Sequence, residues 1–110
     1  MGAGSPRRRG RGSKAESKVA RLYQRAGFQV HRNKRSRAGE IDIIAKRAGT
    51  KLIVEVKSGR QTLTSTDIMK LYRKAKYHGG IPVLRIGPHV KLTENARSLA
   101  RELGVRIKRY

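Results

Sequence analysis

The chain has 110 residues, which is enough for one domain and too few for two. Its 28 Lys and Arg against 7 Asp and Glu give a formal net charge of +21, which predicts a polyanionic partner such as backbone phosphate. The chain has no cysteine, which excludes disulfides, thiol nucleophiles and cysteine-ligated zinc. No apolar run is long enough to span a membrane, and no apolar stretch follows the basic N-terminus. We therefore expect a soluble, intracellular protein of the cytoplasm, associated with the nucleoid, with neither a membrane nor a small molecule as its partner.

The N-terminal segment is the first region of distinct composition. Residues 1–12 contain arginines, no acidic residue and almost nothing apolar, which is typical of a disordered basic arm. Residues 13–110 remain strongly basic and are expected to form a single domain. The cations of the arm that we expect to bind DNA are Arg7, Arg8, Arg9 and Arg11.

The next segments predict a helix followed by three strands. Residues 13–27 carry an apolar stripe at helical spacing that a glycine closes. Residues 28–32 alternate as a short strand, and residues 33–39 are rich in cations and turn formers, which indicates a basic loop. Two β-rich runs at 40–45 and 52–57 are typical of a hairpin.

The second half of the chain predicts two helices and two strands. Residues 64–79 and 93–104 each begin at a threonine cap and end at glycine, with apolar residues at helical spacing between. Residues 81–86 and 105–110 are typical of strands. The order α-β-β-β-α-β-α-β predicts one α/β domain with a mixed sheet flanked by helices.

The rare acidic residues gather in the predicted hairpin. Side chains on a strand alternate between its two faces, so Glu40 and Asp42 share one face of the first strand, and Glu55 and Lys57 share one face of the second. A tight turn centred on residues 48–49 sets Asp42 opposite Glu55 and Glu40 opposite Lys57. Glu40 then either forms a cross-strand ion pair with Lys57 or contributes to a metal site.

Two opposed carboxylates repel each other unless a cation lies between them. Mg²⁺ suits such a site because it takes one or two carboxylates together with water and phosphate oxygens, and Mn²⁺ is the alternative. A metal there would activate water, and Lys57 would stabilise the charge that develops on phosphorus. The pattern therefore predicts cleavage of a phosphodiester.

Asp42, followed thirteen residues later by Glu55-Val56-Lys57, is similar to the D…(D/E)xK signature of the restriction-endonuclease-like nucleases. From about residue 12 to residue 86 the chain also resembles the archaeal Holliday junction resolvases. One difference is Ile41, which stands where that family usually has proline, and this variant resembles a small bacterial group of predicted nucleases with the same fold. The segments that carry the resemblance are GSKAE, GFQVHR, the basic loop with its serine, and LYRKAKYHGGIPVLRI.

The resemblance implies a fold, a site and a partner. The fold is a restriction-endonuclease-like αβββαβ core, and Glu16, Asp42 and Glu55 would bind Mg²⁺. Lys57 would support the transition state and Ser36 would assist catalysis. A homodimer would match the two-fold symmetry of branched, four-way junction DNA. The cations in and beside the loop that are expected to bind DNA are Arg32, Lys34, Arg35 and Arg37.

Each of these residues also has a simpler interpretation. Glu16 can close a capping box with Ser13. Asp42 and Glu55 can be strand acids on a solvated face, and Ser36 can be a turn residue or a phosphate contact.

Two other functions remain open from the sequence. A small, basic chain with a basic arm also fits a non-catalytic, ribosomal-type nucleic-acid-binding protein. A nuclease of the same fold with another substrate, such as a nicking, repair or restriction enzyme, fits the acidic residues equally well.

Overall fold

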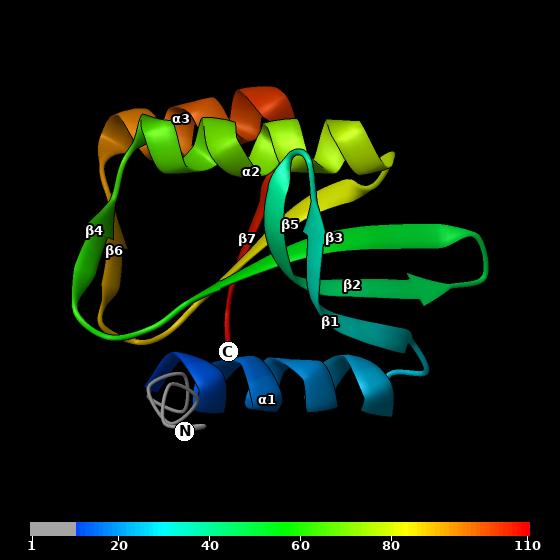
Figure 1. Ribbon diagram of the computed structural model, residues 1–110. Coiled ribbons are helices and arrows are strands. Elements are labelled where there is room, and N and C mark those ends of the chain that lie inside the picture. Colours follow the sequence, from blue (N-terminus) through cyan, green and yellow to red (C-terminus); the bar gives the residue numbers. More distant parts are fainter. Residues whose placement is uncertain (1–10) are drawn as a thin grey trace, which may run out of the picture.

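The computed structural model describes residues 11–110 and contains a five-stranded mixed sheet between two layers of helix (Figure 1). The residues of the predicted arm from 1 to 10, including Arg7, Arg8 and Arg9, lie outside the described residues. Within 11–110, no helix is long and apolar enough to cross a membrane. The helices are α1 (Arg11–Arg25), α2 (Ser65–His78) and α3 (Glu94–Leu103), and the strands are β1 (Gln29–Ser36), β2 (Gly39–Arg47), β3 (Thr50–Lys57), β4 (Gln61–Leu63), β5 (Ile81–Ile86), β6 (Val90–Leu92) and β7 (Arg106–Arg109).

The central sheet has the strand order β1-β2-β3-β5-β7. The strands β1, β2 and β3 are antiparallel, whereas β3, β5 and β7 are parallel, because α2 and α3 provide the crossovers. The helix α1 lies against one face, and α2 and α3 lie against the other (Figure 1). The predicted mixed α/β core is therefore confirmed.

Each face of the sheet has its own apolar core. The stripe of α1, with Val19 and Tyr23 buried, packs on one face. The stripes of α2 and α3, which include Ile68, Leu71 and Ala96, pack on the other. Burial of a large apolar side chain contributes about 1.5–3 kcal/mol, so these stripes fix where α1 and α2 lie relative to the strands.

The hairpin between β2 and β3 has the predicted turn and register. Ala48 and Gly49 have φ angles of 47° and 83°, which a two-residue turn with left-handed central residues requires. The pairs from Arg47↔Thr50 to Ile43↔Val54 follow the register expected for that turn.

Two expectations about strands were wrong. The segment 33–39 is not a loop, since β1 continues through it to Ser36. This strand lies at the edge of the sheet, where cations remain solvated, so its composition resembles that of a loop. The short strands β4 and β6 were not predicted, and they form a separate two-stranded parallel sheet. With only three residues each, they are too short to show an alternating pattern.

Candidate active site

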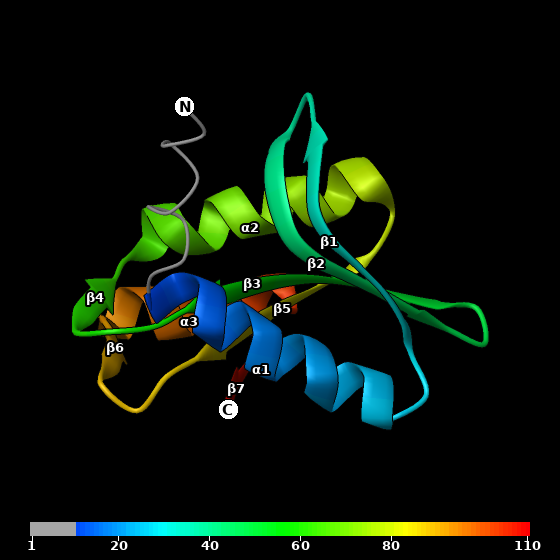
Figure 2. The ribbon, with the colours of Figure 1, turned by 60° about the horizontal axis from the view of Figure 1, so that its bottom comes forward.

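Asp42 lies where the hairpin bends away from the sheet. The pairing of β1 with β2 omits Asn33 and Asp42, and the pairing of β2 with β3 ends at Ile43 and Val54. Asn33 has a φ of 54°, a left-handed conformation that asparagine tolerates. Beyond this point the two strands rise from the sheet toward α2 (Figure 2). The side chain of Asp42 is then free to reach β3, where its Oδ2 accepts a 2.8 Å hydrogen bond from the backbone N–H of Val56.

Glu55 projects from β3 between two lysines. Its Oε2 lies 3.6 Å from Nζ of Lys57, two residues along the same strand, and its Oε1 lies 3.6 Å from Nζ of Lys74 on α2. Lys74 also donates a 2.8 Å hydrogen bond to the carbonyl oxygen of Glu40 on the rising part of β2. Lys74 thus joins three elements, α2, β2 and β3, at this carboxylate.

Burial disfavours ionisation of both carboxyl groups. Desolvation is the largest effect on the pKa of Asp42 and of Glu55, and it raises each above its usual value. The charge of Asp42 raises the pKa of Glu55 further, whereas Lys74 and Lys57 act against the increase. The hydrogen bond from Val56 likewise acts against the increase at Asp42. Two half-buried carboxylates that repel each other favour a bound cation.

Of the two interpretations of Glu40, the cross-strand ion pair with Lys57 is wrong. The β2–β3 ladder opens before it reaches these residues, so they are not paired across the strands. Lys57 forms its ion pair with Glu55 instead, and Glu40 uses its backbone carbonyl to accept from Lys74.

Glu16 is held on α1 by an ion pair with β1. Its Oε1 lies 3.5 Å from a guanidinium nitrogen of Arg32, and Arg32 also donates to the hydroxyl of Ser17 at 3.1 Å. The capping box with Ser13 is wrong, because α1 already begins at Arg11. Burial raises the pKa of Glu16, and the charge of Asp42 adds to this increase.

The described residues do not bring three acidic groups together. Within 11–110, no group of three or more His, Cys, Asp or Glu side chains is close enough to hold a metal ion. The pair that remains, Asp42 and Glu55, fits a hard divalent cation, which needs only one or two carboxylates if water and phosphate complete its shell. Glu16 stands outside this pair.

Ser36 closes the turn between β1 and β2. Its hydroxyl donates to the carbonyl oxygen of Gly39 at 3.0 Å and accepts from the N–H of Ala38 at 3.2 Å. The hydroxyl also lies 2.9 Å from Nε2 of His78, at the end of α2. These contacts tie the tip of the hairpin to α2. The cations of this hairpin, all exposed, are Arg32, Lys34, Arg35 and Arg37.

Lys74 is the site residue that the sequence did not single out. Its place beside Glu55 depends on how α2 packs across the sheet, which no local pattern encodes. The only sequence signal is its position at i+3 from the buried Leu71, at the edge of the apolar stripe. A pocket of about 170 Å³ lies here, and its lining includes Glu55, Lys57, Lys70, Leu71, Lys74 and Leu84.

Residues 8–108 match the Mrr_cat family, described as restriction endonuclease, and the chain belongs to this family. A UPF0102 protein of Caldicellulosiruptor saccharolyticus is 36% identical over 75 residues, which cover 60% of this chain and 64% of that relative. Another, from Pseudothermotoga lettingae, is 44% identical over 61 residues, 52% of this chain and 57% of that protein. The chain therefore matches less than two thirds of the length of these relatives.

Solved structures share the fold at low sequence identity. EndoMS in complex with double-stranded DNA superposes with a TM-score of 0.63 at 17% identity, covering 87% of this chain and 44% of that one. The Holliday junction resolvase Hjc of Archaeoglobus fulgidus superposes with a TM-score of 0.56 at 23% identity, covering 77% of this chain and 67% of that one. SfsA of Pyrococcus furiosus, in complex with Ca²⁺, superposes with a TM-score of 0.62 at 17% identity, covering 88% of this chain and 56% of that one. Family and fold together place the chain among the restriction-endonuclease-like nucleases, as its sequence predicted.

Proposed function

We propose that the protein is a divalent-metal-dependent, structure-selective DNA endonuclease that cuts four-way junctions. The observation that carries the catalytic assignment is the pair of half-buried carboxylates, Asp42 and Glu55, which lie on neighbouring strands with Lys57 and Lys74 beside them. The net charge of +21 supports a DNA substrate.

Asp42 and Glu55 are proposed to hold Mg²⁺ or Mn²⁺, and Glu16 is the candidate for a further contact. The metal would supply an activated water and a Lewis acid for the phosphoryl oxygen. Asp42 is oriented for this role by the N–H of Val56. Lys57 is proposed to stabilise the charge on phosphorus, and Ser36 to contribute from the hairpin tip.

Selectivity for DNA shape follows from what the chain can contact. The cations of the N-terminal arm and of β1 suit phosphates, and phosphate contacts position a protein without reading sequence. A four-way junction has two strands to cut, so we propose a homodimer with one site in each subunit.

Duplex cleavage is the second candidate. It is favoured by the DNA-bound EndoMS fold, which superposes on a larger part of this chain than the resolvase does.

A cleavage assay with Mg²⁺ on a four-way junction, a duplex and single strands tests both candidates. Asp42→Ala and Glu55→Ala are each expected to abolish cutting, while Glu94→Gln, an exposed acid on α3, serves as the matched control. Equal cutting by wild type and the two alanine variants would overturn the catalytic assignment. Preference for duplex would remove the resolvase activity and leave the nuclease.

A further inference from the structure

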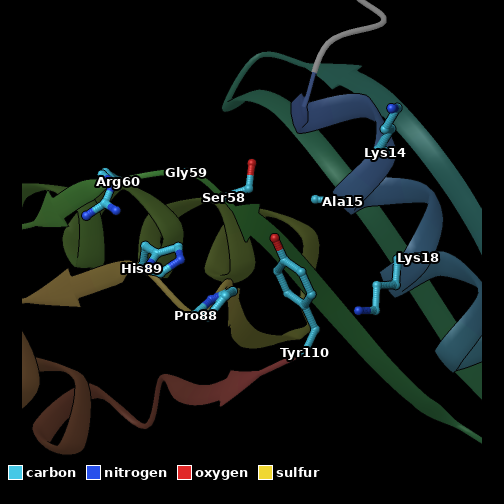
Figure 3. A pocket seen from close by; sticks show the side chains of 9 residues that line it. All are labelled: Lys14, Ala15, Lys18, Ser58, Gly59, Arg60, Pro88, His89 and Tyr110. Atoms are coloured by element: carbon cyan, nitrogen blue, oxygen red, sulfur yellow. The ribbon is translucent and has the colours of Figure 1, made fainter.

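A second, larger pocket of about 650 Å³ opens beside the end of β3 (Figure 3). The start of α1, the loop after β3, the loop after β5 and the aromatic residue after β7 surround it. The described residues that line it include three cations and a histidine but no acidic residue, so its charge suits an anion. The polar and aromatic side chains of the lining are Lys14, Lys18, Ser58, Arg60, His89 and Tyr110. We call this the basic pocket.

The aromatic wall of the basic pocket is fixed in position. The backbone N–H of Tyr110 donates to the carbonyl of Ile86 at 3.1 Å. The ring passes so close to Gly87 that a Cβ there would lie 2.8 Å from the Tyr110 hydroxyl. Nζ of Lys18 lies 5.6 Å from the ring centroid, within the range of a cation–π contact. These contacts hold the ring at the wall of the pocket.

The loop after β5 is also held in place. The N–H of Gly87 donates to the carbonyl of Lys57 at 2.9 Å, which ties this loop to the end of β3. Arg109 donates to the carbonyls of Gly87 at 2.7 Å and Val90 at 3.2 Å. These contacts are made within the protein itself, so binding in the pocket needs little ordering of the loop.

The basic pocket lies at the end of β3, the strand that carries Glu55 and Lys57. Ser58, in its lining, directly follows Lys57 along the chain. A volume of about 650 Å³ lies within the 300–1,000 Å³ that small-molecule sites occupy, which is enough for one nucleotide.

We propose that the basic pocket binds one nucleotide of the DNA strand that the protein holds. Its phosphate lies among Lys14, Lys18 and Arg60, and its base lies against Tyr110. The proposal rests on the DNA binding of the proposed function and does not require cleavage.

The test measures binding of a fluorescent DNA strand by anisotropy, in EDTA, over a range of salt concentrations. Changing Lys14 and Lys18 together to glutamine should weaken binding about tenfold and reduce the salt slope by about 0.7 for each phosphate of the single strand that is no longer bound. Changing Arg97 and Arg101 on α3 to glutamine removes the same charge from the opposite side of the sheet, and it should weaken binding less than about twofold.

The base contact has a separate readout. Tyr110→Leu should weaken binding about tenfold because stacking is removed, while the salt slope stays unchanged, and Tyr110→Phe should restore it. Thermal denaturation of each variant shows whether it is folded. Gly87→Ala, which displaces the ring without changing it, provides an independent variant with the same expected result.

Calorimetry with deoxyadenosine monophosphate distinguishes a strand from a free nucleotide. We expect no measurable binding of the mononucleotide at millimolar concentration. Binding that disappears on changing Lys14 and Lys18 would assign the pocket to a free nucleotide and overturn the proposal. An equal decrease of DNA affinity in the α1 and α3 variants would overturn it as well. Neither result depends on whether wild type cuts DNA, so failure of the proposed cleavage is seen separately in the nuclease assay.

Discussion

Lys74 on α2 lies 3.6 Å from Glu55 on β3 and donates a 2.8 Å hydrogen bond to the backbone of β2. The lysine therefore holds the glutamate between two strands and a helix. Lys57 reaches the other carboxylate oxygen, also at 3.6 Å. One carboxylate thus has a cation on each side, and both cations lower its pKa against the effect of burial.

Lys74→Met should move the pH dependence of cleavage. Loss of the Lys74 charge raises the pKa of Glu55 further, so the rising limb of the pH–rate profile shifts to higher pH. Cleavage at neutral pH should fall about tenfold, which corresponds to the loss of about 1.4 kcal/mol of charge interaction. The measurement is the rate of Mg²⁺-dependent cleavage between pH 5 and 9. Lys76→Met, an exposed lysine on the same helix, is the control, and equal profiles for the two variants would contradict this role.

Neutralising the half-buried carboxylates Asp42 and Glu55 should stabilise the protein in the absence of metal. The pKa values of Asp42 and Glu55 are raised in the folded state, so the folded protein binds protons more tightly than the unfolded chain. The folded protein therefore loses stability as the pH rises from the pKa of the unfolded chain to that of the folded state. The double variant Asp42→Asn, Glu55→Gln removes this loss. At pH 7 in EDTA we expect a gain of about 1 kcal/mol, or roughly 4 °C in Tm, which disappears toward pH 4.

Mg²⁺ should then raise the Tm of wild type but not of this variant, because only the carboxylates bind it. Glu94→Gln with Glu102→Gln removes two acids from the ends of α3 and should give no gain in EDTA. A wild type whose Tm is unaffected by Mg²⁺ would count against the metal site.

The role of Glu16 can be separated from its ion pair. If Glu16 contacts the metal, Glu16→Gln should raise the Mg²⁺ concentration for half-maximal thermal stabilisation about tenfold. Arg32→Gln frees the carboxylate and should leave that concentration unchanged or lower it. If both variants show the same small decrease of Tm and no change in Mg²⁺ requirement, the ion pair between Glu16 and Arg32 is only structural. Ion pairs near the surface contribute less than about 1 kcal/mol to stability.

Deletion of residues 2–10 tests the predicted arm and leaves α1 intact, because that helix begins at Arg11. The deletion removes Arg7, Arg8 and Arg9. DNA affinity should fall, and the salt slope should decrease by about 0.9 for each phosphate that the arm had bound. Titrations of a labelled duplex at several salt concentrations measure both quantities. An unchanged slope would mean that the arm contacts no phosphate.

The parts of the fold that depend on short-range signals were predictable. The glycine after Ala48 indicated the turn, and that turn sets the register as far as Ile43 and Val54, the residues next to Asp42 and Glu55. Thr93 at the start of α3 was also correctly recognised, since its hydroxyl accepts from the N–H of Ala96 at 3.0 Å.

The parts of the fold that depend on tertiary packing could not be predicted from the sequence. The continuation of β1 to Ser36 is stabilised by its pairing with β2, although its own residues resemble a loop. The β2–β3 ladder ends at Ile43 and Val54, before Glu40 can meet Lys57, and no local residue pattern indicates where a ladder opens. Lys74 reaches the site only because α2 crosses the sheet.

The turn at Ala48 and Gly49 lies at the opposite end of the β2–β3 hairpin from the carboxylates. Added residues at this tip would extend the hairpin outward, and loop lengthening costs only about 0.6 kcal/mol for each doubling. The tip is therefore the place in this fold to insert a peptide tag, a fluorophore or a second domain while the spacing of Asp42 and Glu55 is preserved. For the same reason, a DNA-reading module could be added at this turn during evolution without a change in the spacing of these two carboxylates.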